Sequence, residues 1–324
     1  MPNIYELQKK YFVFLMQRNM KQKRNIIIFF SFFLLVVSTS QAQRAARWRR
    51  MRYEVIYGVG GTNFLGELGG ANQIGTNFVR DFEVAQTRPL LSIGMRYKIL
   101  QDFAIKASLY FGYLHGDDNT TTEQFRHNRN LRFRSPIVEF GPQLEYSIFR
   151  ERIGHRYNLR RVRGIKGFAV NTYFFVGITG FWFNPQGKYT DGKWYNLQPL
   201  GTEGQGLIAT RKKYSRIQVA IPYGIGFKYG LSRKWSVGLE YGARKTFTDY
   251  IDDVSTTYFD NQLIRENYGD IAAQLADPSS GEHSNWTAAG QQRGDAKDKD
   301  SYMFMSITLT YKLRQNRQGL PKFY

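Results

Sequence analysis

The sequence predicts an all-β protein: an eight-stranded antiparallel up-and-down transmembrane β-barrel of the outer-membrane kind, with long extracellular loops and short periplasmic turns. Residues 301–313 (SYMFMSITLTYKL) alternate strictly between an apolar and a mostly polar face, which indicates a long strand. The chain has 16% aromatic residues and 31 glycines. Membrane barrels use aromatic residues in the girdles at the membrane interfaces and small residues in crowded parts of the wall. The third observation is the regular alternation of short and long connections between the expected strands.

The N-terminal segment is expected to direct export. Residues 20–42 (MKQKRNIIIFFSFFLLVVSTSQA) contain a basic start, an apolar stretch at 26–37 and small residues before the end. This order is typical of a secretory signal peptide, and the apolar stretch is too short to cross a bilayer comfortably as a helix. We therefore expect translation to start at Met20, residues 1–19 to be an upstream extension, and cleavage to occur near Ala42.

Eight segments have the period-two pattern of strands. In chain order they span residues 53–65, 89–100, 103–114, 133–149, 165–183, 214–230, 235–247 and 301–313. The fifth is the least regular, because Phe and Tyr occupy both of its faces. An even number of strands suits antiparallel closure with both chain termini on one side of the membrane. The barrel is thus expected over 53–313, between a basic periplasmic arm at 43–52 and a basic tail at 314–324. The last strand also resembles the closing strand that the outer-membrane assembly machinery reads.

The connections between these strands alternate in length. Those after the second and sixth strands are tight turns, and the one after the fourth is of moderate length. Those after the other strands are long, at 66–88, 115–132, 184–213 and 248–300. Short periplasmic turns and long outer loops are typical of bacterial outer-membrane barrels, whereas a soluble sandwich has no reason for such alternation.

The inward face of the expected barrel has charges of both signs. An eight-stranded barrel is just wide enough for its own side chains, and unpaired buried charges are costly. We therefore expect ion pairs to fill the lumen, which argues against a passive porin or sugar channel. The inward charged residues are Glu54, Arg96, Lys98, Lys106, Glu139, Glu145, Lys228, Glu240 and Arg244.

The formal net charge of +20 would suit nucleic-acid binding, but no such motif is present and the charges lie at particular strand ends. The expected periplasmic segments 44–52, 151–164, 233–234 and 314–324 are basic, with Glu151 as their single acidic residue. The loop 248–300 instead has eleven acidic and four basic residues. Ordinary solvated charge and the docking of an acidic partner both remain open. The candidate partner-binding residues are Arg156, Arg160, Arg161, Arg163, Arg233 and Lys234.

Residues suited to chemistry are few. The chain has no cysteine, and its four histidines lack metal-ligand spacing. Three carboxylates, Asp249, Asp252 and Asp253, could bind Ca²⁺, but they lack the spacing and glycine of an EF-hand. Salt bridges from these carboxylates to arginines of the loop 115–132 (Arg126, Arg129 or Arg132) are the preferred interpretation. His115 and Ser135 are weak candidates for a lipid enzyme. We expect no catalysis, cofactor, metal or small-molecule substrate.

Several stretches resemble one known family. They are GTNFLGELGGANQIG, HNRNLRFRSPIVEF, QPLGTEGQG, RKKYSRIQVAIPYGIGFKY and GLEYGARKTFTDYIDDVSTTYFD. The chain resembles, over 53–313, the PorG-like (DUF6089-type) outer-membrane β-barrel family of Bacteroidota, which includes a component of the type IX secretion system. The resemblance implies an integral outer-membrane protein whose inner rim contacts the periplasmic ring formed by a PorK-like lipoprotein and its PorN-like partner. A stand-alone OmpA-like envelope barrel, or an adhesin acting through its outer loops, is the alternative.

Overall fold

The computed structural model describes residues 51–68, 86–120, 123–149, 170–232, 234–279, 281–316 and 319–322. The expected signal peptide and nearly all of the basic arm lie outside these residues, as does the segment 151–164. Among the described residues, no helix combines the length and the apolar character needed to cross a membrane.

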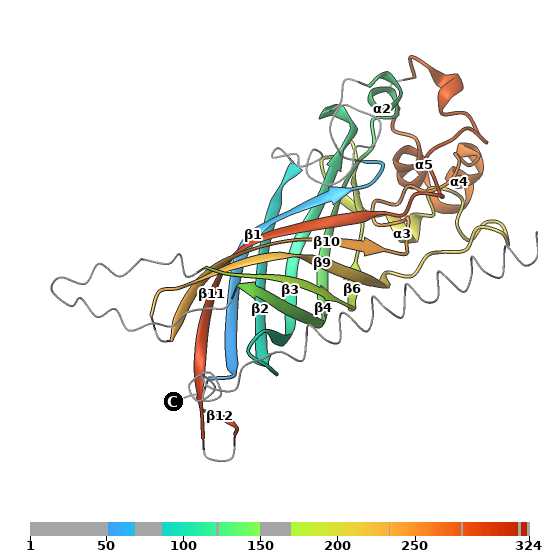
Figure 1. Cartoon of the computed structure of the whole chain (residues 1–324). Helices are drawn as coiled ribbons and strands as arrows, with labels where there is room; N and C mark the ends of the chain where they lie inside the picture. The colour runs from blue at the N-terminus through green and yellow to red at the C-terminus, as the bar shows by residue number, and fades with distance from the viewer. Residues whose placement is uncertain are drawn as a thin grey trace, which may run out of the picture. The chain divides into compact units, whose positions relative to one another are not determined.

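The described part is built on one antiparallel sheet of 12 strands (Figure 1). Its long strands are β1 (Tyr53–Leu65), β2 (Arg88–Lys98), β3 (Phe103–Asp117), β4 (Arg132–Phe149), β5 (Val170–Gly177), β6 (Thr179–Phe183), β9 (Ile217–Gly230), β10 (Trp235–Thr246) and β11 (Ser301–Gln315). Three short strands complete it: β7 (Gln186–Lys188), β8 (Trp194–Asn196) and β12 (Pro321–Lys322).

The sheet closes on itself. Its strands follow the order β3-β2-β1-β11-β10-β9-β5-β4, and β4 pairs again with β3. Because β5 and β6 both lie between β4 and β9, they share one position of the ring. The ring therefore has eight positions, as predicted. The first and last long strands pair along the whole of β1, from Tyr53 opposite Leu313 to Leu65 opposite Ser301.

The strand boundaries agree closely with the sequence pattern, except at the predicted fifth strand. This segment is divided into β5 and β6 at Ile178, which lies opposite Pro142 of β4 in the continuous register. Proline has no amide hydrogen, so the ladder lacks one hydrogen bond there. The Ile178 amide still donates to the Pro142 carbonyl oxygen at 3.2 Å. The interruption is thus local, and the ring remains continuous.

The two ends of the barrel differ in how their strands are connected. At the end that we call the turn end, the Leu100 amide donates to the Phe103 oxygen at 3.1 Å and the Ser232 amide donates to the Trp235 oxygen at 3.0 Å. Both are tight turns, as predicted. At the opposite loop end, longer segments fold over the strands (Figure 1). They include η4 (Asp118–Thr120), α2 (Gln124–Arg129), α3 (Leu197–Leu200), α4 (Asn261–Tyr268), α5 (Asp270–Ala276) and η5 (Ser284–Trp286).

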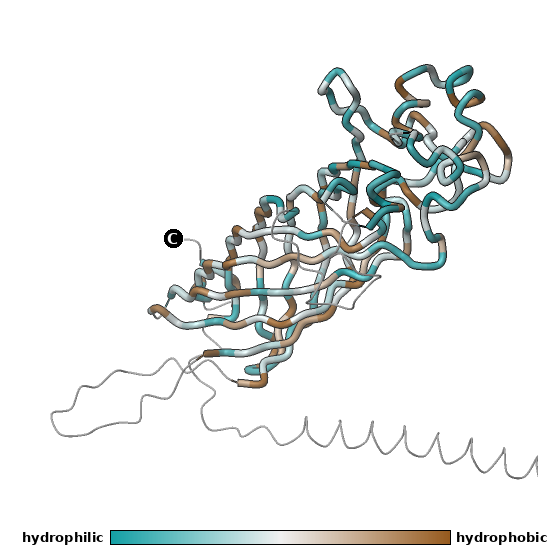
Figure 2. The backbone as a smooth tube through the Cα atoms, turned by 90° about the horizontal axis from the view of Figure 1, so that it is seen from above, coloured by the Kyte–Doolittle hydropathy of each residue, from teal (hydrophilic) through white to brown (hydrophobic). Residues whose placement is uncertain are grey.

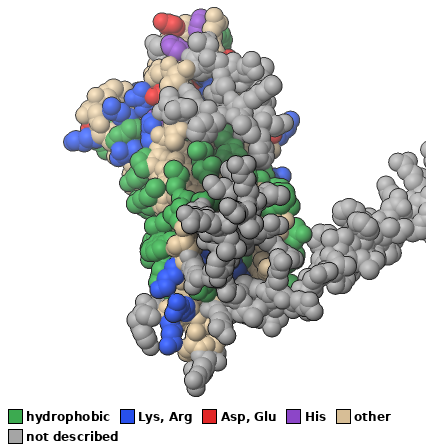
Figure 3. Space-filling view, turned by 60° about the vertical axis from the view of Figure 1, so that its left-hand side comes forward, with side chains coloured by type: hydrophobic (Ala, Val, Ile, Leu, Met, Phe, Trp, Pro, Cys, Tyr) green, Lys and Arg blue, Asp and Glu red, His purple; other side chains and the backbone are tan. Residues whose placement is uncertain are grey.

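The outer wall is apolar. Alternate residues along the strands point outward, and hydropathy alternates accordingly (Figure 2). Hydrophobic side chains form a band across the visible face in Figure 3. Exposed wall residues include Tyr57, Val59, Leu91, Ile93, Leu109, Phe111, Phe140, Leu144, Phe174, Val176, Val219, Met305 and Ile307. Met303 and Leu313, which the alternation of residues 301–313 puts on the apolar face of β11 with Met305 and Ile307, are nevertheless buried, and the Tyr241 hydroxyl lies 2.8 Å from the Met303 sulfur.

The interior contains an apolar core toward the loop end. Large buried side chains from several strands pack there with two residues from the loop after β10, Ile251 and Val254. The other members include Phe64, Leu90, Leu114, Phe133, Ile137, Phe181, Phe183, Tyr302 and Phe304. Phe and Tyr on both faces of the predicted fifth strand were the sequence signal for this core, since Phe181 and Phe183 point inward. The interior is therefore filled by apolar packing as well as by charge.

Candidate functional site

The lumen near the turn end is filled by a charged network centred on Glu54, whose side chain is 0% exposed. Its carboxylate accepts from Arg96 Nη1 at 2.9 Å and forms ion pairs with Lys98 at 2.7 Å and Lys228 at 3.1 Å. These partners come from two different strands, β2 and β9. One carboxylate on β1 thus connects opposite parts of the wall across the interior.

Two more buried acids complete this network. The Arg96 guanidinium pairs with Glu145 at 2.5 Å, and Lys106 Nζ lies 2.7 Å from a carboxylate oxygen of Glu240. The Tyr173 hydroxyl donates to the other oxygen of Glu240 at 2.5 Å. Charges of both signs are therefore satisfied inside the barrel, which is the condition for burying them.

A second layer lies between this network and the apolar core. Arg244 Nε is 3.3 Å from the Glu139 carboxylate, which also accepts from the Tyr302 hydroxyl at 2.7 Å. The Arg244 guanidinium lies 4.0 Å from the ring centroid of Phe304, a cation–π distance. All nine charged residues that the sequence placed inside lie inside and form ion pairs. These layers place paired charges of both signs inside the lumen.

Three aromatic pairs lie at the turn end. Neighbouring strands bring together Tyr53 with Tyr97, Phe103 with Tyr146 and Trp235 with Tyr311, with ring centroids 4.8, 4.9 and 4.7 Å apart. Membrane barrels place such aromatic girdles where the hydrocarbon meets the headgroups. The girdle and the apolar band above it form the surface expected of a membrane-embedded wall.

Of the six candidate partner-binding residues, only Lys234 is among the described residues. Its ammonium donates to the Tyr311 hydroxyl at 3.2 Å, so it lies at the aromatic girdle. The basic residues Arg52, Arg314 and Lys322 belong to the same end. Asp102, in the turn after β2, also lies there, so the described residues at this end include acidic as well as basic charge. Arg156, Arg160, Arg161, Arg163 and Arg233 lie outside the described residues.

The loop end is covered by segments that buried ion pairs hold together; we call this the loop cap. Arg293 Nη1 donates to Glu203 at 3.0 Å and to the Asp253 backbone oxygen at 2.6 Å. Arg129 Nε donates to Asp118 at 2.8 Å, and its Nη1 donates to the Arg293 backbone oxygen, also at 2.8 Å. Charged side chains thus connect loops that are far apart in the sequence.

The expected salt bridges from Asp249, Asp252 and Asp253 to the arginines of the loop 115–132 are wrong. Arg126 and Arg129 pair with Asp118, and Arg132 pairs with Asp117. These aspartates lie in the same loop as the arginines, so bringing the two together costs little loop-closure entropy. The Asp253 carboxylate instead accepts from the hydroxyls of Thr202 and Tyr214, and burial raises its pKa to about 6 against the lowering effect of Arg293.

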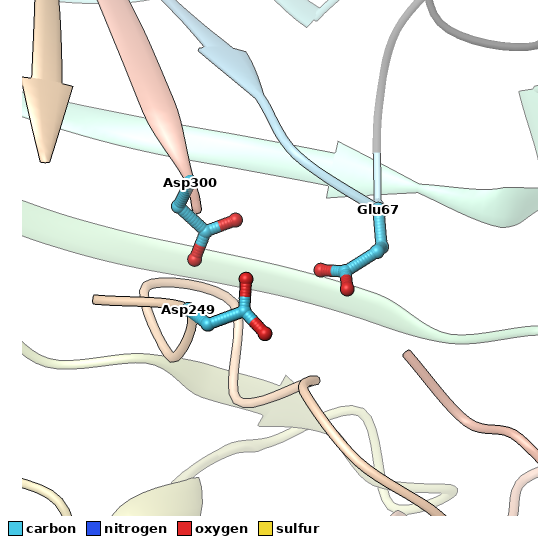
Figure 4. Close-up of side chains that lie close together, drawn as sticks. All are labelled: Glu67, Asp249 and Asp300. Carbon is cyan, nitrogen blue, oxygen red and sulfur yellow. The ribbon is translucent and has the colours of Figure 1, made fainter. Parts of the chain in front are cut away.

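Another carboxylate cluster is present, and the sequence did not reveal it. Glu67, Asp249 and Asp300 each offer a carboxylate oxygen, and these oxygens all lie within 4.8 Å of one another (Figure 4). Burial is the main cause that raises the pKa of Glu67 to about 7 and of Asp249 to about 6. Burial, together with Asp252 and Glu67, also raises the pKa of Asp300 well above its usual value. Asp252 lies nearby but accepts from the backbone amides of Leu68 and Val254.

The weak catalytic pair is not assembled. In the β3–β4 register Leu114 lies opposite Ser135, and His115 lies opposite Arg134. His115 and Ser135 consequently point to opposite faces of the sheet. Ser135 Oγ accepts from the Asn184 amide at 3.1 Å, whereas His115 Nδ1 lies 2.6 Å from the Phe133 oxygen. This serine and histidine cannot act as nucleophile and base.

An open pocket of about 450 Å³ lies in the loop cap between α4, α5 and residues 281–289. Its lining is mixed: polar residues such as Asp260, Asn261 and Asp277 alternate with apolar ones such as Tyr258, Phe259 and Ala276. Sequence reasoning missed this pocket, because the segments that line it have no period-two pattern and meet only in the folded loop cap.

Comparison with solved structures found similar chains at low sequence identity. The attachment invasion locus protein Ail of Yersinia pestis, in complex with the heparin analogue sucrose octasulfate, is 8% identical with a TM-score of 0.36, over 80% of this chain and 97% of that one. A major outer membrane protein from Thermus thermophilus is 11% identical with a TM-score of 0.34, over 80% and 99%. The outer membrane protein OprG from Pseudomonas aeruginosa is 8% identical with a TM-score of 0.33, over 82% and 98%. No curated protein sequence matches the chain.

Comparison with protein families found one match, described as "Domain of unknown function (DUF6089)", over residues 25–274. The match ends within α5, so it does not include β11, although the resemblance noted in the sequence was expected to reach residue 313. It nevertheless spans more than half of the 324 residues. The chain therefore belongs to the DUF6089 family.

Proposed function

We propose that this protein is a non-catalytic integral barrel of the bacterial outer membrane, and an accessory or structural component of the type IX secretion system that contacts the periplasmic ring. The observation that carries the proposal is the ion-paired lumen inside an exposed apolar wall. A wall of this kind suits lipid, and a filled lumen leaves no route for solutes. Such a barrel would then interact with its partners through its two ends.

The turn end supports docking to a periplasmic partner. Basic residues at this end are Arg52, Lys234, Arg314 and Lys322, and the sequence adds the segment 151–164. A predominantly basic surface favours association with an acidic partner and speeds the encounter. The choice of the PorK- and PorN-like ring proteins as that partner comes from the family resemblance alone. Nucleic acid is not proposed as a partner, because the sequence has no nucleic-acid-binding motif and many basic residues are paired with acids in the lumen or the loop cap.

A tagged pull-down from gently solubilised native outer membranes, with and without crosslinking, tests the proposal. We expect recovery of the ring proteins, with crosslinks through 151–164 or the N-terminal arm. Reversing Arg160, Arg161 and Arg163 to Glu should weaken this recovery without preventing barrel assembly.

The matched control reverses three exposed lysines of the loop-end segments, Lys188, Lys212 and Lys297, to Glu. It changes the net charge equally and should leave recovery unchanged. Unchanged recovery after the arginine reversal would count against the basic surface. Recovery of the barrel alone would remove the secretion role and leave the fold assignment standing.

A stand-alone OmpA-like barrel or adhesin remains the second candidate, and the loop cap favours it. Buried ion pairs order these loops around an open pocket, which is more structure than simple connections need. The genome distinguishes the two candidates, because a secretion component requires that the ring proteins be encoded alongside it. An adhesin would instead lose surface binding when the loop cap is cut by protease on intact cells.

A further inference from the structure

We propose that Glu67, Asp249 and Asp300 bind one divalent cation, of the calcium type, that ties the end of β1 to both ends of the segment joining β10 and β11. This site replaces the sequence-based expectation of no metal, and it is separate from the proposed docking surface at the turn end. It also differs from the set Asp249, Asp252 and Asp253 considered from the sequence, since only Asp249 belongs to both.

The geometry of the three carboxylates suits such an ion. One oxygen from each lies within 4.8 Å of the others, and in Figure 4 the carboxylate groups face a common space. A Ca²⁺ ion about 2.3–2.6 Å from its oxygens can join oxygens that are up to about 5 Å apart. Mg²⁺ needs oxygens at about 2.0–2.1 Å in a strict octahedron. Ligands from three separate segments fit the larger and more adaptable shell of Ca²⁺ better.

The hydrogen bonding of the cluster independently points to a missing ligand. Asp249 is only 3% exposed, and neither of its carboxylate oxygens has a partner at hydrogen-bonding distance and angle, although Ser255 and Lys299 lie close enough to lower its pKa against the effect of burial. Asp300 Oδ1 and Glu67 Oε2 also lack one. Within the described ranges, no Lys or Arg forms an ion pair with any of the three. A buried carboxylate without a partner is costly, and a cation supplies what these oxygens lack.

The oxygens that do have partners orient the cluster. Asp300 Oδ2 accepts from the Ile251 amide at 2.8 Å, and Glu67 Oε1 accepts from the Asp295 amide at 2.6 Å. Each of these two carboxylates therefore uses one oxygen for a backbone amide and leaves the other available. Metal-binding carboxylates are commonly held in this way by hydrogen bonds from outside the ligand shell.

Two glycines leave room for this arrangement. A Cβ at Gly66 would lie 2.3 Å from Asp300 Oδ1, and one at Gly294 would lie 2.8 Å from Glu67 Oε1. Larger residues at either position would displace the carboxylates. The competing explanation is a metal-free cluster that stays neutral by holding protons, and the experiment must separate the two.

The test uses the full chain, purified and folded in detergent, with Ca²⁺ itself as the probe. Equilibrium dialysis with ⁴⁵Ca²⁺ should give one bound ion per chain, and Mg²⁺ should compete at least tenfold more weakly. Ca²⁺ should also slow proteolysis of the loop cap relative to EDTA. Two results with the unchanged protein would overturn the proposal. One is that no saturable binding occurs at millimolar Ca²⁺, and the other is that Mg²⁺ competes as strongly as unlabelled Ca²⁺.

Variants locate the ion. Asp249→Asn should lower the Ca²⁺ affinity at least tenfold and abolish the protection from protease. Asp298→Asn, an exposed aspartate of the same loop, should behave like the unchanged protein. Asp249→Asn removes a buried unpaired charge, so in EDTA it should fold at least as well as the unchanged chain. Binding that survives in both Asp249→Asn and Asp300→Asn would refute this site.

Discussion

The charged network of the lumen should be highly sensitive to the loss of Glu54. Glu54→Gln keeps the size of the side chain but removes the charge that faces Arg96, Lys98 and Lys228. Removing one partner of a buried ion pair costs about 3–5 kcal/mol, because the remaining charge loses its compensation. Lys98 is partly exposed and can turn toward solvent, whereas Arg96 and Lys228 are almost fully buried. We therefore expect a loss of about 3 kcal/mol in the free energy of unfolding, at the lower end of that range.

Urea unfolding of the barrel in lipid vesicles, followed by tryptophan fluorescence, measures this loss. The heat-dependent shift in gel mobility that folded barrels show gives a second reading. The control is Glu266→Gln, on the exposed face of α4, which should change stability by no more than about 0.5 kcal/mol. The double variant Glu54→Gln with Lys228→Met removes both charges of one pair. It should be less destabilised than the sum of the two single variants, by about 0.5–3 kcal/mol.

Two results would refute this reasoning. The first is a free energy of unfolding for Glu54→Gln that lies within about 0.5 kcal/mol of that of the unchanged chain. Water or a rearranged partner would then compensate the cations, and the network would not be tightly coupled. If the double variant is as unstable as the sum of the single ones, Glu54 and Lys228 do not interact energetically despite their distance of 3.1 Å.

Three further predictions concern closure, pH and conductance. Gly60→Ala should reduce the folded fraction and cost about 1–3 kcal/mol, because a Cβ there would lie 1.9 Å from the Met305 backbone oxygen; folding yields equal to those of the unchanged chain would contradict this. The folded state raises the pKa of Asp253 to about 6, so this group binds its proton more tightly than in the unfolded chain. Its contribution should therefore lower stability by about 2.4 kcal/mol as pH rises from 4 to 7, and Asp253→Asn should flatten that slope in unfolding experiments. In planar bilayers the unchanged barrel should show no steady open-pore conductance, whereas Arg96→Ala with Glu240→Ala should leak ions; an equal leak from both would show that the lumen is not filled.

The sequence was sufficient for most of the strands and for the charged residues of the lumen, but not for the apolar core beside them. A period of two fixes which side chains share a face, so inward residues such as Glu54 and Arg244 could be named without coordinates. Their pairings could not be named, because ring closure decides which strands meet across the interior. The division of the fifth strand followed from Pro142 on its neighbour, which is visible only once the register is known.

The loop cap was beyond the reach of the sequence pattern. Glu67, Asp249 and Asp300 come from segments far apart in the chain, and no periodicity joins loop residues. Ion pairs within one loop were easier to predict from the sequence, since Asp118 and Arg129 belong to the same loop. The error was to assign the arginines to a distant acidic stretch instead of to the nearest aspartates, although closing a short loop costs less entropy.

The pairing of β1 with β11 has a consequence for how the chain is made. All 13 residues of β1 are partnered on one side by the last long strand. During synthesis, the first strand therefore has an unpaired edge until the last long strand arrives. Exposed strand edges invite aggregation with other chains. Whatever route the chain takes, this edge of the first strand must be protected until the last long strand pairs with it.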